Sequence, residues 1–158
     1  MKDLLNIMNF LDSSLTSYHA IAYMKKMLLQ EGFTELSEKD IWSLEKGGNY
    51  FVIRNDSSMI AFRVPECDVA QVQGYHVYAA HSDSPAFKVK ENPVVEKEGI
   101  YVSLNTENYG SMNMSTWFDR PLTIAGRVCV EQDGEIVPCL IQLKDNICMI
   151  PSLAIHMN

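Results

Sequence analysis

The stretch Gly74-Tyr75-His76-Val77-Tyr78-Ala79-Ala80-His81-Ser82-Asp83-Ser84-Pro85 decides the fold class that the sequence predicts. Residues 75–80 carry few polar atoms, and such a run is typical of a strand buried on both faces inside an α/β sheet. The polar segment 81–84 follows directly, at the carboxyl end of that strand. Because open α/β sheets place their ligand sites at this edge, we predict an α/β fold in which His81-Ser82-Asp83 is the best local candidate for a site.

Two helices and a hairpin are predicted before this strand. Apolar residues within 3–12 recur with the spacing of one helical face. A second helix begins near Thr16 or Ser17, which are both competent N-caps, and ends at Gly32, since glycine readily adopts the left-handed conformation. Residues 50–54 and 59–64 flank a turn-forming segment and predict a β-hairpin.

After about residue 94 the pattern becomes that of an antiparallel β region. Residues 94–95 and 100–104 flank a polar turn and predict a hairpin, and residues 122–130 and 136–143 flank Asp133-Gly134, a strong turn signal. We therefore divide the chain into residues 1–93 and 94–158.

The segment 105–120 is polar and long for a loop, and loops of this length tend to be functional or mobile. Within it, Trp117 has the chemistry to stack on Arg120, and Asp119 to pair with the same guanidinium. Two interpretations stay open: a loop anchored by its aromatic residues, or an interface or substrate-facing loop.

Composition excludes several classes of protein. The chain has 158 residues, 47% of them hydrophobic and 21% charged, which is the range of globular proteins and not of disordered ones. A net charge of −7 argues against a nucleic-acid partner. No apolar run approaches the roughly 20 residues that span a bilayer, and the N-terminus lacks the features of a signal peptide. The four cysteines form no C-x-x-C pair, so we expect a cytoplasmic protein with reduced thiols.

Histidines are the main candidates for chemistry. The spacing of His81 and Asp83 suits a metal-bound imidazole whose other ring N–H is held by a carboxylate. The alternative is a strand-end histidine bonded to a turn aspartate, which spacing alone favours. His156 follows an apolar segment and is either functional or a solvent-facing residue. His76 is expected to be a hydrogen-bonded core residue, and His19 a cap or surface residue that has the position to line a groove.

Familiar nucleotide and hydrolase motifs are missing. The sequence contains no G-x-G-x-x-G, P-loop, G-x-S-x-G or H-E-x-x-H, so nucleotide binding and serine-hydrolase chemistry have no support.

A set of segments nevertheless matches one family, in that family's order along nearly the whole chain. They are Phe10-Leu11-Asp12, Tyr18-His19-Ala20, Gly47-Gly48-Asn49-Tyr50-Phe51, Ser57-Ser58-Met59-Ile60-Ala61-Phe62, Ala80-His81-Ser82-Asp83-Ser84-Pro85, Tyr109-Gly110, Ser115-Thr116-Trp117-Phe118-Asp119-Arg120, Ala125-Gly126-Arg127-Val128 and Ile150-Pro151-Ser152-Leu153-Ala154-Ile155-His156. On these segments the chain resembles the N-terminal part of the aspartyl aminopeptidase family of co-catalytic zinc metallopeptidases.

The resemblance implies a function and its residues. His81 matches the family's first zinc ligand, Asp83 the carboxylate that supports it, and His156 a histidine that reaches into a neighbouring subunit's active site and helps stabilise the oxyanion. Such enzymes remove N-terminal residues, preferably Asp or Glu, from peptides, with two metal ions that polarise the carbonyl and activate water. Zinc is the expected metal, although imidazole and carboxylate sites also accept cobalt or manganese.

The resemblance also implies an architecture. It predicts part of a phosphorylase/hydrolase-like zinc peptidase sheet, followed by the beginning of an inserted β-rich dimerisation domain. The family forms a large homo-oligomer built from dimers.

The differences between this chain and the family determine what we expect of residues 1–158 in isolation. The family is far longer, with its other zinc ligands and its general-base glutamate downstream, and some members carry a glycine at the position of Ser111. We expect residues 1–158 to bind zinc weakly, to lack peptidase activity and to self-associate through an open sheet edge. The alternative is a non-catalytic assembly or regulatory module that retains the first half of the fold.

Overall fold

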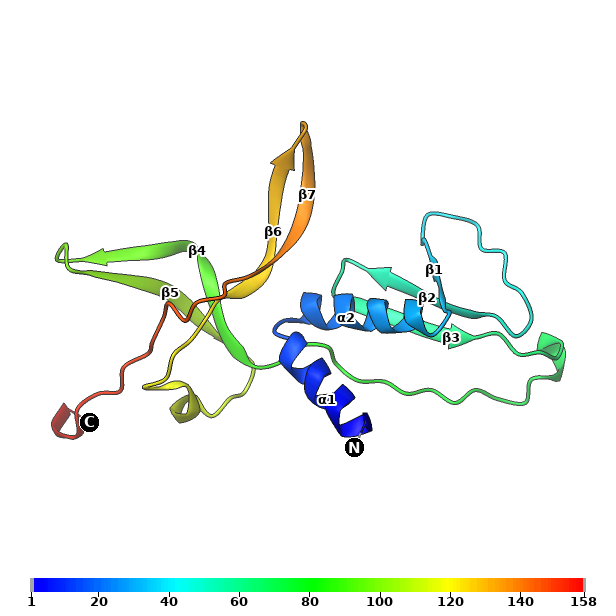
Figure 1. The fold of residues 1–158 in the computed structure, drawn as a ribbon, viewed down its shortest axis with the longest axis horizontal. Coiled ribbons are helices and arrows are strands. Elements are labelled where there is room, and N and C mark those ends of the chain that lie inside the picture. The colour runs from blue at the N-terminus through cyan, green and yellow to red at the C-terminus, as the bar shows by residue number, and fades with distance from the viewer. Residues whose placement is uncertain (1, 158) are drawn as a thin grey trace. The chain divides into compact units, whose positions relative to one another are not determined.

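The computed structural model of the chain describes residues 2–157, which form two compact units (Figure 1). The first unit comprises Met1–Asp83 and Ile124–Gln142, and the second Ser84–Thr123 and Leu143–Asn158. No helix among the described residues is long and apolar enough to cross a membrane.

Two helices open the first unit, as the sequence predicted. Helix α1 spans Lys2–Ser13 and α2 spans Ser17–Gln30. Thr16 caps α2 because its extended backbone, with φ −141°, lets its side-chain oxygen accept the N–H of His19. Gly32 ends the helical segment at φ +79°, where a side chain would be strained.

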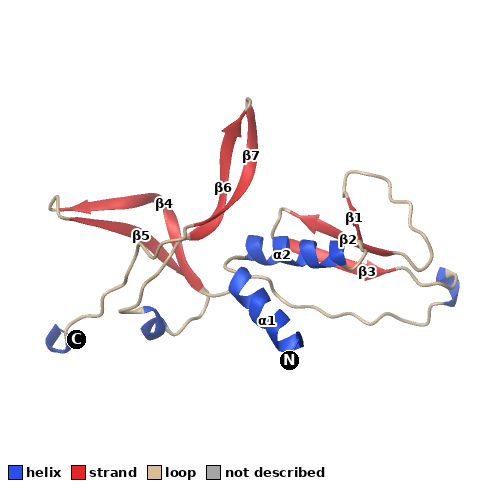
Figure 2. Cartoon of the chain, viewed as in Figure 1, coloured by secondary structure: helices blue, strands red, loops and turns tan. Residues whose placement is uncertain are grey.

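A three-stranded sheet follows. Strand β1 (Thr34–Leu36) is parallel to β2 (Asn49–Arg54), and β2 is antiparallel to β3 (Ser58–Arg63). The predicted hairpin is therefore confirmed, with Asn55 and Asp56 at positive φ in its turn. The buried hydrophobic residues of this unit lie on α2 and β2 and are Ala20, Ile21, Tyr50, Phe51 and Val52. The result is a mixed α/β unit, shown by colour in Figure 2.

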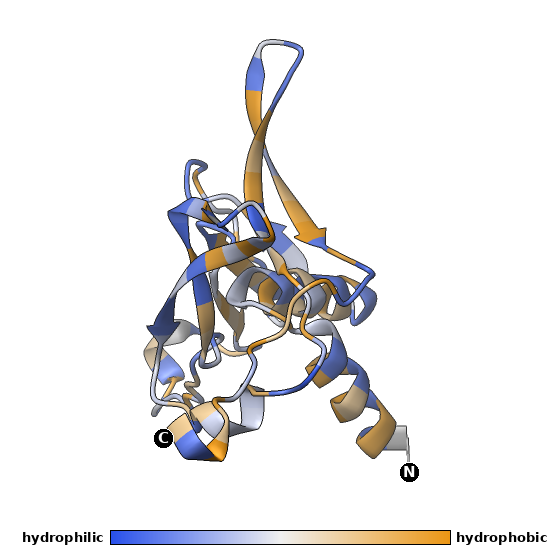
Figure 3. Ribbon diagram, turned by 90° about the vertical axis from the view of Figure 1, so that its left-hand side faces the viewer, coloured by the Kyte–Doolittle hydropathy of each residue, from blue (hydrophilic) through white to orange (hydrophobic). Residues whose placement is uncertain are grey.

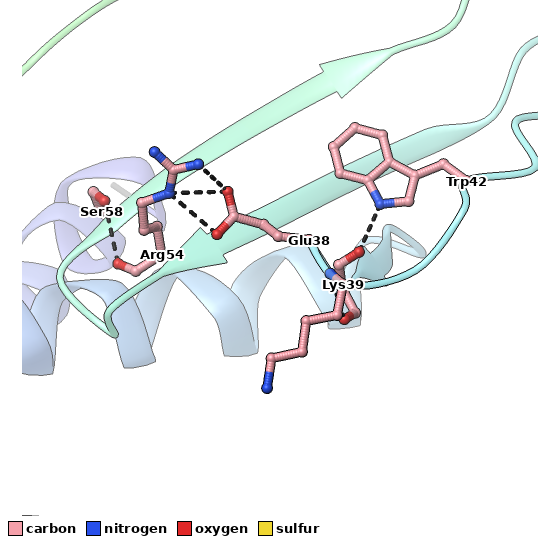
Figure 4. Close-up of polar contacts among 6 residues, drawn as sticks. Glu38, Lys39, Trp42, Arg54 and Ser58 are labelled. Atoms are coloured by element: carbon pink, nitrogen blue, oxygen red, sulfur yellow. Dashed lines mark hydrogen bonds and ion pairs between the residues drawn. The ribbon is translucent and has the colours of Figure 1, made fainter.

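The segment between β1 and β2 is held against the sheet by polar contacts (Figure 4). Arg54 donates from Nε to both carboxylate oxygens of Glu38, at 2.9 and 3.1 Å. These hydrogen bonds lower the pKa of Glu38. Trp42 donates its indole N–H to the carbonyl of Ser37 at 2.7 Å, and its ring stacks on Phe62.

Steric contact with Tyr50 explains why glycine occupies position 48 in the Gly-Gly-Asn-Tyr-Phe segment. The Tyr50 hydroxyl accepts the N–H of Glu45 at 2.9 Å, so its ring folds back over the backbone of Gly48. A Cβ at Gly48 would lie 2.5 Å from that ring. Only glycine fits at this position without displacing the buried tyrosine.

A second hairpin completes the first unit. Strands β6 (Ala125–Gln132) and β7 (Glu135–Gln142) meet at the predicted turn, with Asp133 and Gly134 at positive φ. Figure 3 shows hydrophilic residues at its tip and hydrophobic residues along its strands. Arg127 joins this hairpin to the rest of the unit: Nη1 donates to the Asn55 carbonyl at 3.0 Å, and the guanidinium lies 4.2 Å from the Tyr18 ring centre.

Residues 75–80 do not form the predicted buried strand, so that prediction is wrong for this structure. The segment is extended and unpaired by any strand among residues 2–157, and Tyr75, Val77 and Tyr78 are 75%, 82% and 94% exposed. His76 is likewise exposed and is not the expected core residue. A central strand requires hydrogen-bonded neighbours, and the sheet β1-β2-β3 does not extend to this segment.

Antiparallel pairing dominates the second unit. Strands β4 (Ala86–Lys97) and β5 (Tyr101–Tyr109) form one long hairpin that pairs Val94 with Leu104, as predicted. The alternating residues 87–90 belong to the same strand, before an irregularity in register between Val89 and Val94. Because β5 continues to Tyr109, the predicted loop 105–120 was too long. Short 3-10 turns follow at η2 (Met114–Trp117) and η3 (Ile155–Met157), and a third, η1 (Val69–Gln71), lies in the first unit.

His19, in the first turn of α2, gives the first unit a pH dependence. Burial lowers the pKa of His19, whose ring also bonds the backbone of Ile141 and lies 2.8 Å from the Thr16 hydroxyl oxygen. A folded-state pKa below the unfolded value means that this contribution is complete above about pH 6.5 and is lost as the pH falls through the lower, folded value. Acidification from about pH 8 to about pH 5 should therefore lower the melting temperature by at most a few degrees.

Calorimetry of two variants tests this dependence. His19→Gln should reduce the pH dependence, since glutamine does not titrate, and His76→Gln is the control at an exposed histidine. An equal pH dependence in His19→Gln and the parent would contradict the assignment.

Candidate metal-binding site

His81 and Asp83 contact each other in the loop that follows the extended segment. The His81 Nδ1 lies 2.8 Å from the Asp83 carbonyl oxygen and 3.1 Å from its Oδ1. Both partners are acceptors, so this geometry assigns the proton to Nδ1 and leaves a lone pair on Nε2. Within residues 2–157 no hydrogen bond occupies Nε2, and the His81 side chain is 81% exposed. This is the tautomer and orientation of an imidazole that binds a metal.

A hydrogen bond anchors this loop to the sheet. The Ser82 hydroxyl donates to the Ser57 carbonyl at 2.9 Å, and Ser57 lies in the β2–β3 turn. Ser82, which lies between the candidate ligand and its carboxylate, thus connects both to a hairpin whose strand β2 contains three of the buried residues of the first unit.

Zinc fits His81 as a single ligand, but residues 2–157 do not complete a site. A catalytic zinc ion takes about three protein ligands plus water. The part of the chain that the structure describes contains no group of three or more His, Cys, Asp or Glu side chains able to hold a metal. The donor set in this loop is one oriented imidazole, with the carboxylate and the carbonyl of Asp83 bonded to its other ring nitrogen.

His156 belongs to the other unit. It lies in η3, where it is exposed. The structure therefore brings together His81 and Asp83, whereas His156 is positioned by contacts within the second unit.

One polar contact was not anticipated from the sequence. Asp119 accepts hydrogen bonds from Ser152, through its backbone N–H at 3.0 Å and its hydroxyl at 2.5 Å, and not from Arg120. These bonds lower the pKa of Asp119. Arg120 instead donates to the Thr116 carbonyl, and Trp117 packs edge-on against Phe87. No spacing signal points to this contact, since 33 residues separate its two partners.

Comparison with known proteins identifies the family. A family model described as "Aminopeptidase I zinc metalloprotease (M18)" matches residues 10–158. A "Probable M18 family aminopeptidase 2" of Clostridium acetobutylicum is 45% identical over 154 residues, covering 96% of this chain and 35% of the relative. A protein of the same name from Pseudomonas syringae pv. tomato is 41% identical over 160 residues, covering 100% of this chain and 37% of the relative. The chain thus spans just over a third of the length of these curated relatives.

Solved structures agree with this result. The chain is similar to one in the cryo-EM structure of the Ape4 and Nbr1 complex, with a TM-score of 0.90, 37% identity, and coverage of 98% of this chain and 30% of that one. It is also similar to the S. cerevisiae mApe1 dodecamer, with a TM-score of 0.84, 29% identity, and coverage of 94% and 35%. Because the family model matches nearly all of the residues and the fold agrees, the chain belongs to the M18 family of aminopeptidases, as its sequence motifs predicted.

Proposed function

We propose that residues 1–158 form the N-terminal part of a zinc aminopeptidase that removes N-terminal residues, preferably Asp or Glu, from peptides. The observation that carries the proposal is the pair His81 and Asp83, whose contact exposes Nε2 as a ligand within a chain of the M18 family. In this role His81 binds zinc through Nε2, and Asp83 holds the ring in the required tautomer.

The chemistry divides between this chain and the rest of the site. Two zinc ions, with cobalt or manganese as alternatives, would supply Lewis-acid polarisation of the scissile carbonyl and an activated water. His156 would donate a hydrogen bond to the oxyanion in a neighbouring subunit. The other ligands and the general base would come from residues outside this chain, since the relatives are far longer.

The proposed architecture follows from the same coverage. Residues 1–93 would be part of a phosphorylase/hydrolase-like peptidase domain, and residues 94–158 the start of an inserted β-rich dimerisation domain. The dodecamer formed by mApe1 supports a homo-oligomer built from dimers. We further propose a cytoplasmic enzyme whose partners are peptide substrates and copies of itself, not nucleic acid or a membrane.

The isolated chain tests the division of ligands. Purified residues 1–158, loaded with zinc, should not hydrolyse an aspartyl or glutamyl arylamide, because the described residues hold no complete metal site. The complete product of the gene that encodes these residues should hydrolyse it. Turnover by the 158-residue chain alone would refute this division.

A different experimental result would favour the alternative function, a non-catalytic assembly or regulatory module. The lack of a complete metal site among residues 2–157 is also what a non-catalytic assembly or regulatory module would show. A gene product that ends at residue 158 and has no activity would support that module and would overturn the proposed enzyme.

A further inference from the structure

The segment that leads to His156 is attached to residues 118–122 within the second unit by a series of backbone hydrogen bonds around two isolated β-bridges, called the ladder below. Leu122 and Cys148 exchange both backbone hydrogen bonds, at 2.8 and 3.1 Å, and the N–H of Asp119 donates to the Ile150 carbonyl at 2.9 Å. Phe118 and Ile150 form a parallel bridge at the same point. The ladder therefore runs from Cys148 toward the C-terminus and approaches His156.

The Asp119 carboxylate provides the last step of this ladder. It accepts the backbone N–H and the hydroxyl of Ser152, one with each oxygen. Beyond Ser152, the N–H of Met157 donates to the Ala154 carbonyl at 2.8 Å, and this internal hydrogen bond closes η3. Asp119 is thus the final anchor before the turn that carries His156, at the red end of the chain in Figure 1.

The backbone of Asp119 is adapted to this contact. Its φ is +54°, in the left-handed region that non-glycine residues adopt uncommonly and that aspartate and asparagine tolerate better than most. In this conformation its N–H bonds Ile150 while its carboxylate bonds Ser152. Asp119 therefore forms hydrogen bonds to two residues of the neighbouring segment, Ile150 and Ser152.

The turn that follows Ser152 needs such an anchor. Leu153, Ile155 and Met157 are 60%, 83% and 71% exposed, so η3 gains little stability from burial in this chain. Without the Ser152 contacts, the rotational freedom of residues 152–157 would increase, and His156 would have no defined orientation.

We propose that Asp119 is a positioning residue that fixes the start of η3 and thereby presents His156 in a defined orientation. The catalytic use of His156 in this inference rests on the proposed function. The contact between Asp119 and Ser152 does not depend on that function and can be tested without an activity measurement. A residue that reaches into another subunit must arrive already oriented, because a misplacement of about 1 Å can cost roughly a hundredfold in rate.

Two substitutions separate the carboxylate from the backbone conformation. Asp119→Asn keeps an acceptor for the Ser152 N–H, a donor for its hydroxyl, and a side chain that tolerates positive φ. Asp119→Gly also tolerates that φ but removes both side-chain contacts. Asp133→Gly is the matched control, since Asp133 has φ +53° in the β6–β7 turn.

Nuclear magnetic resonance of the 158-residue chain tests the anchor. Asp119→Gly should accelerate exchange of the Ser152 amide by about tenfold or more and shift the His156 ring signals, whereas Asp119→Asn and Asp133→Gly should stay close to the parent. Unchanged Ser152 exchange and His156 signals in Asp119→Gly would overturn the proposal.

Kinetics of the complete gene product test the positioning role. Asp119→Gly should lower kcat by roughly ten- to a hundredfold with little change in KM, Asp119→Asn should restore it, and the loss should vanish in a His156→Ala background. An unchanged kcat in Asp119→Gly, while His156→Ala is impaired, would overturn positioning and leave the proposed function intact. An unchanged kcat in His156→Ala would instead overturn the proposed role of His156, and positioning with it.

Discussion

Replacement of His81 by alanine should remove the activity of the complete gene product and one bound metal ion per subunit. The His81 ring is already oriented by two acceptors, and in the proposed function its exposed Nε2 would bind the metal. Because metal polarisation contributes several kcal/mol to the transition state, kcat should fall by about a thousandfold or more. Metal content by mass spectrometry and turnover of an aspartyl arylamide measure the two effects.

Asp83→Ala should be milder than His81→Ala. The shorter contact of His81 Nδ1 is to the backbone carbonyl of residue 83, at 2.8 Å, and it survives a change of side chain. Loss of the carboxylate alone should then weaken metal binding by roughly ten- to a hundredfold, not abolish it.

Two further histidines serve as controls for this prediction. His76→Ala changes an exposed histidine on the preceding extended segment and should leave metal content and kcat unchanged. His156→Ala should lower kcat while both metal ions remain. Full metal content and full activity in His81→Ala would rule out its assignment as a ligand, and metal loss in His156→Ala would show that its proposed role is wrong.

Replacement of Phe51 by alanine should lower the free energy of unfolding of the first unit by about 3–5 kcal/mol. Phe51 is 0% exposed, and it is the largest fully buried side chain among the described residues. It lies on β2 between Tyr50 and Val52, which are also buried although successive strand residues point to opposite faces of the sheet. A domain is stable by only about 5–15 kcal/mol, so this variant should lose much of its folded population.

Urea denaturation followed by circular dichroism measures this loss. Ile60→Ala is the matched control, because Ile60 pairs with Val52 on the neighbouring strand but is 67% exposed. The control should change the unfolding free energy by no more than about 0.5 kcal/mol. Equal midpoints for the two variants would show that the buried face of β2 does not stabilise this unit.

Local chemistry explains which elements the sequence predicted well. The Thr16 cap, the Gly32 stop and the Asp133-Gly134 turn each depend on a few neighbouring residues, and each is present as predicted. Family membership was predicted for the same reason, since its motifs are short segments in a recognisable order.

Non-local pairing explains the failures. The apolar pattern of residues 75–80 indicates a preference for burial. Strand formation also requires a neighbouring strand as hydrogen-bonding partner, and the described residues supply none. The end of β5 was likewise missed, because residues 106–109 pair with β4 despite their loop-like composition.

The contacts of the candidate functional residues also differ in how far they could be predicted, depending on the sequence separation of the two partners. The adjacency of His81 and Asp83 in sequence was sufficient to predict their contact, because two residues of separation bring an imidazole to its carboxylate with little help from the fold. By contrast, Asp119 meets Ser152 across 33 residues, and Arg127 meets Asp56 across 71. Spacing carries no information about such pairs, since the intervening hairpins decide which distant segments meet. The sequence by itself therefore determined the turns, the caps, the family and the His81–Asp83 pair. Only the tertiary structure decided what anchors the segment of His156, because that contact exists only once the chain has folded back on itself.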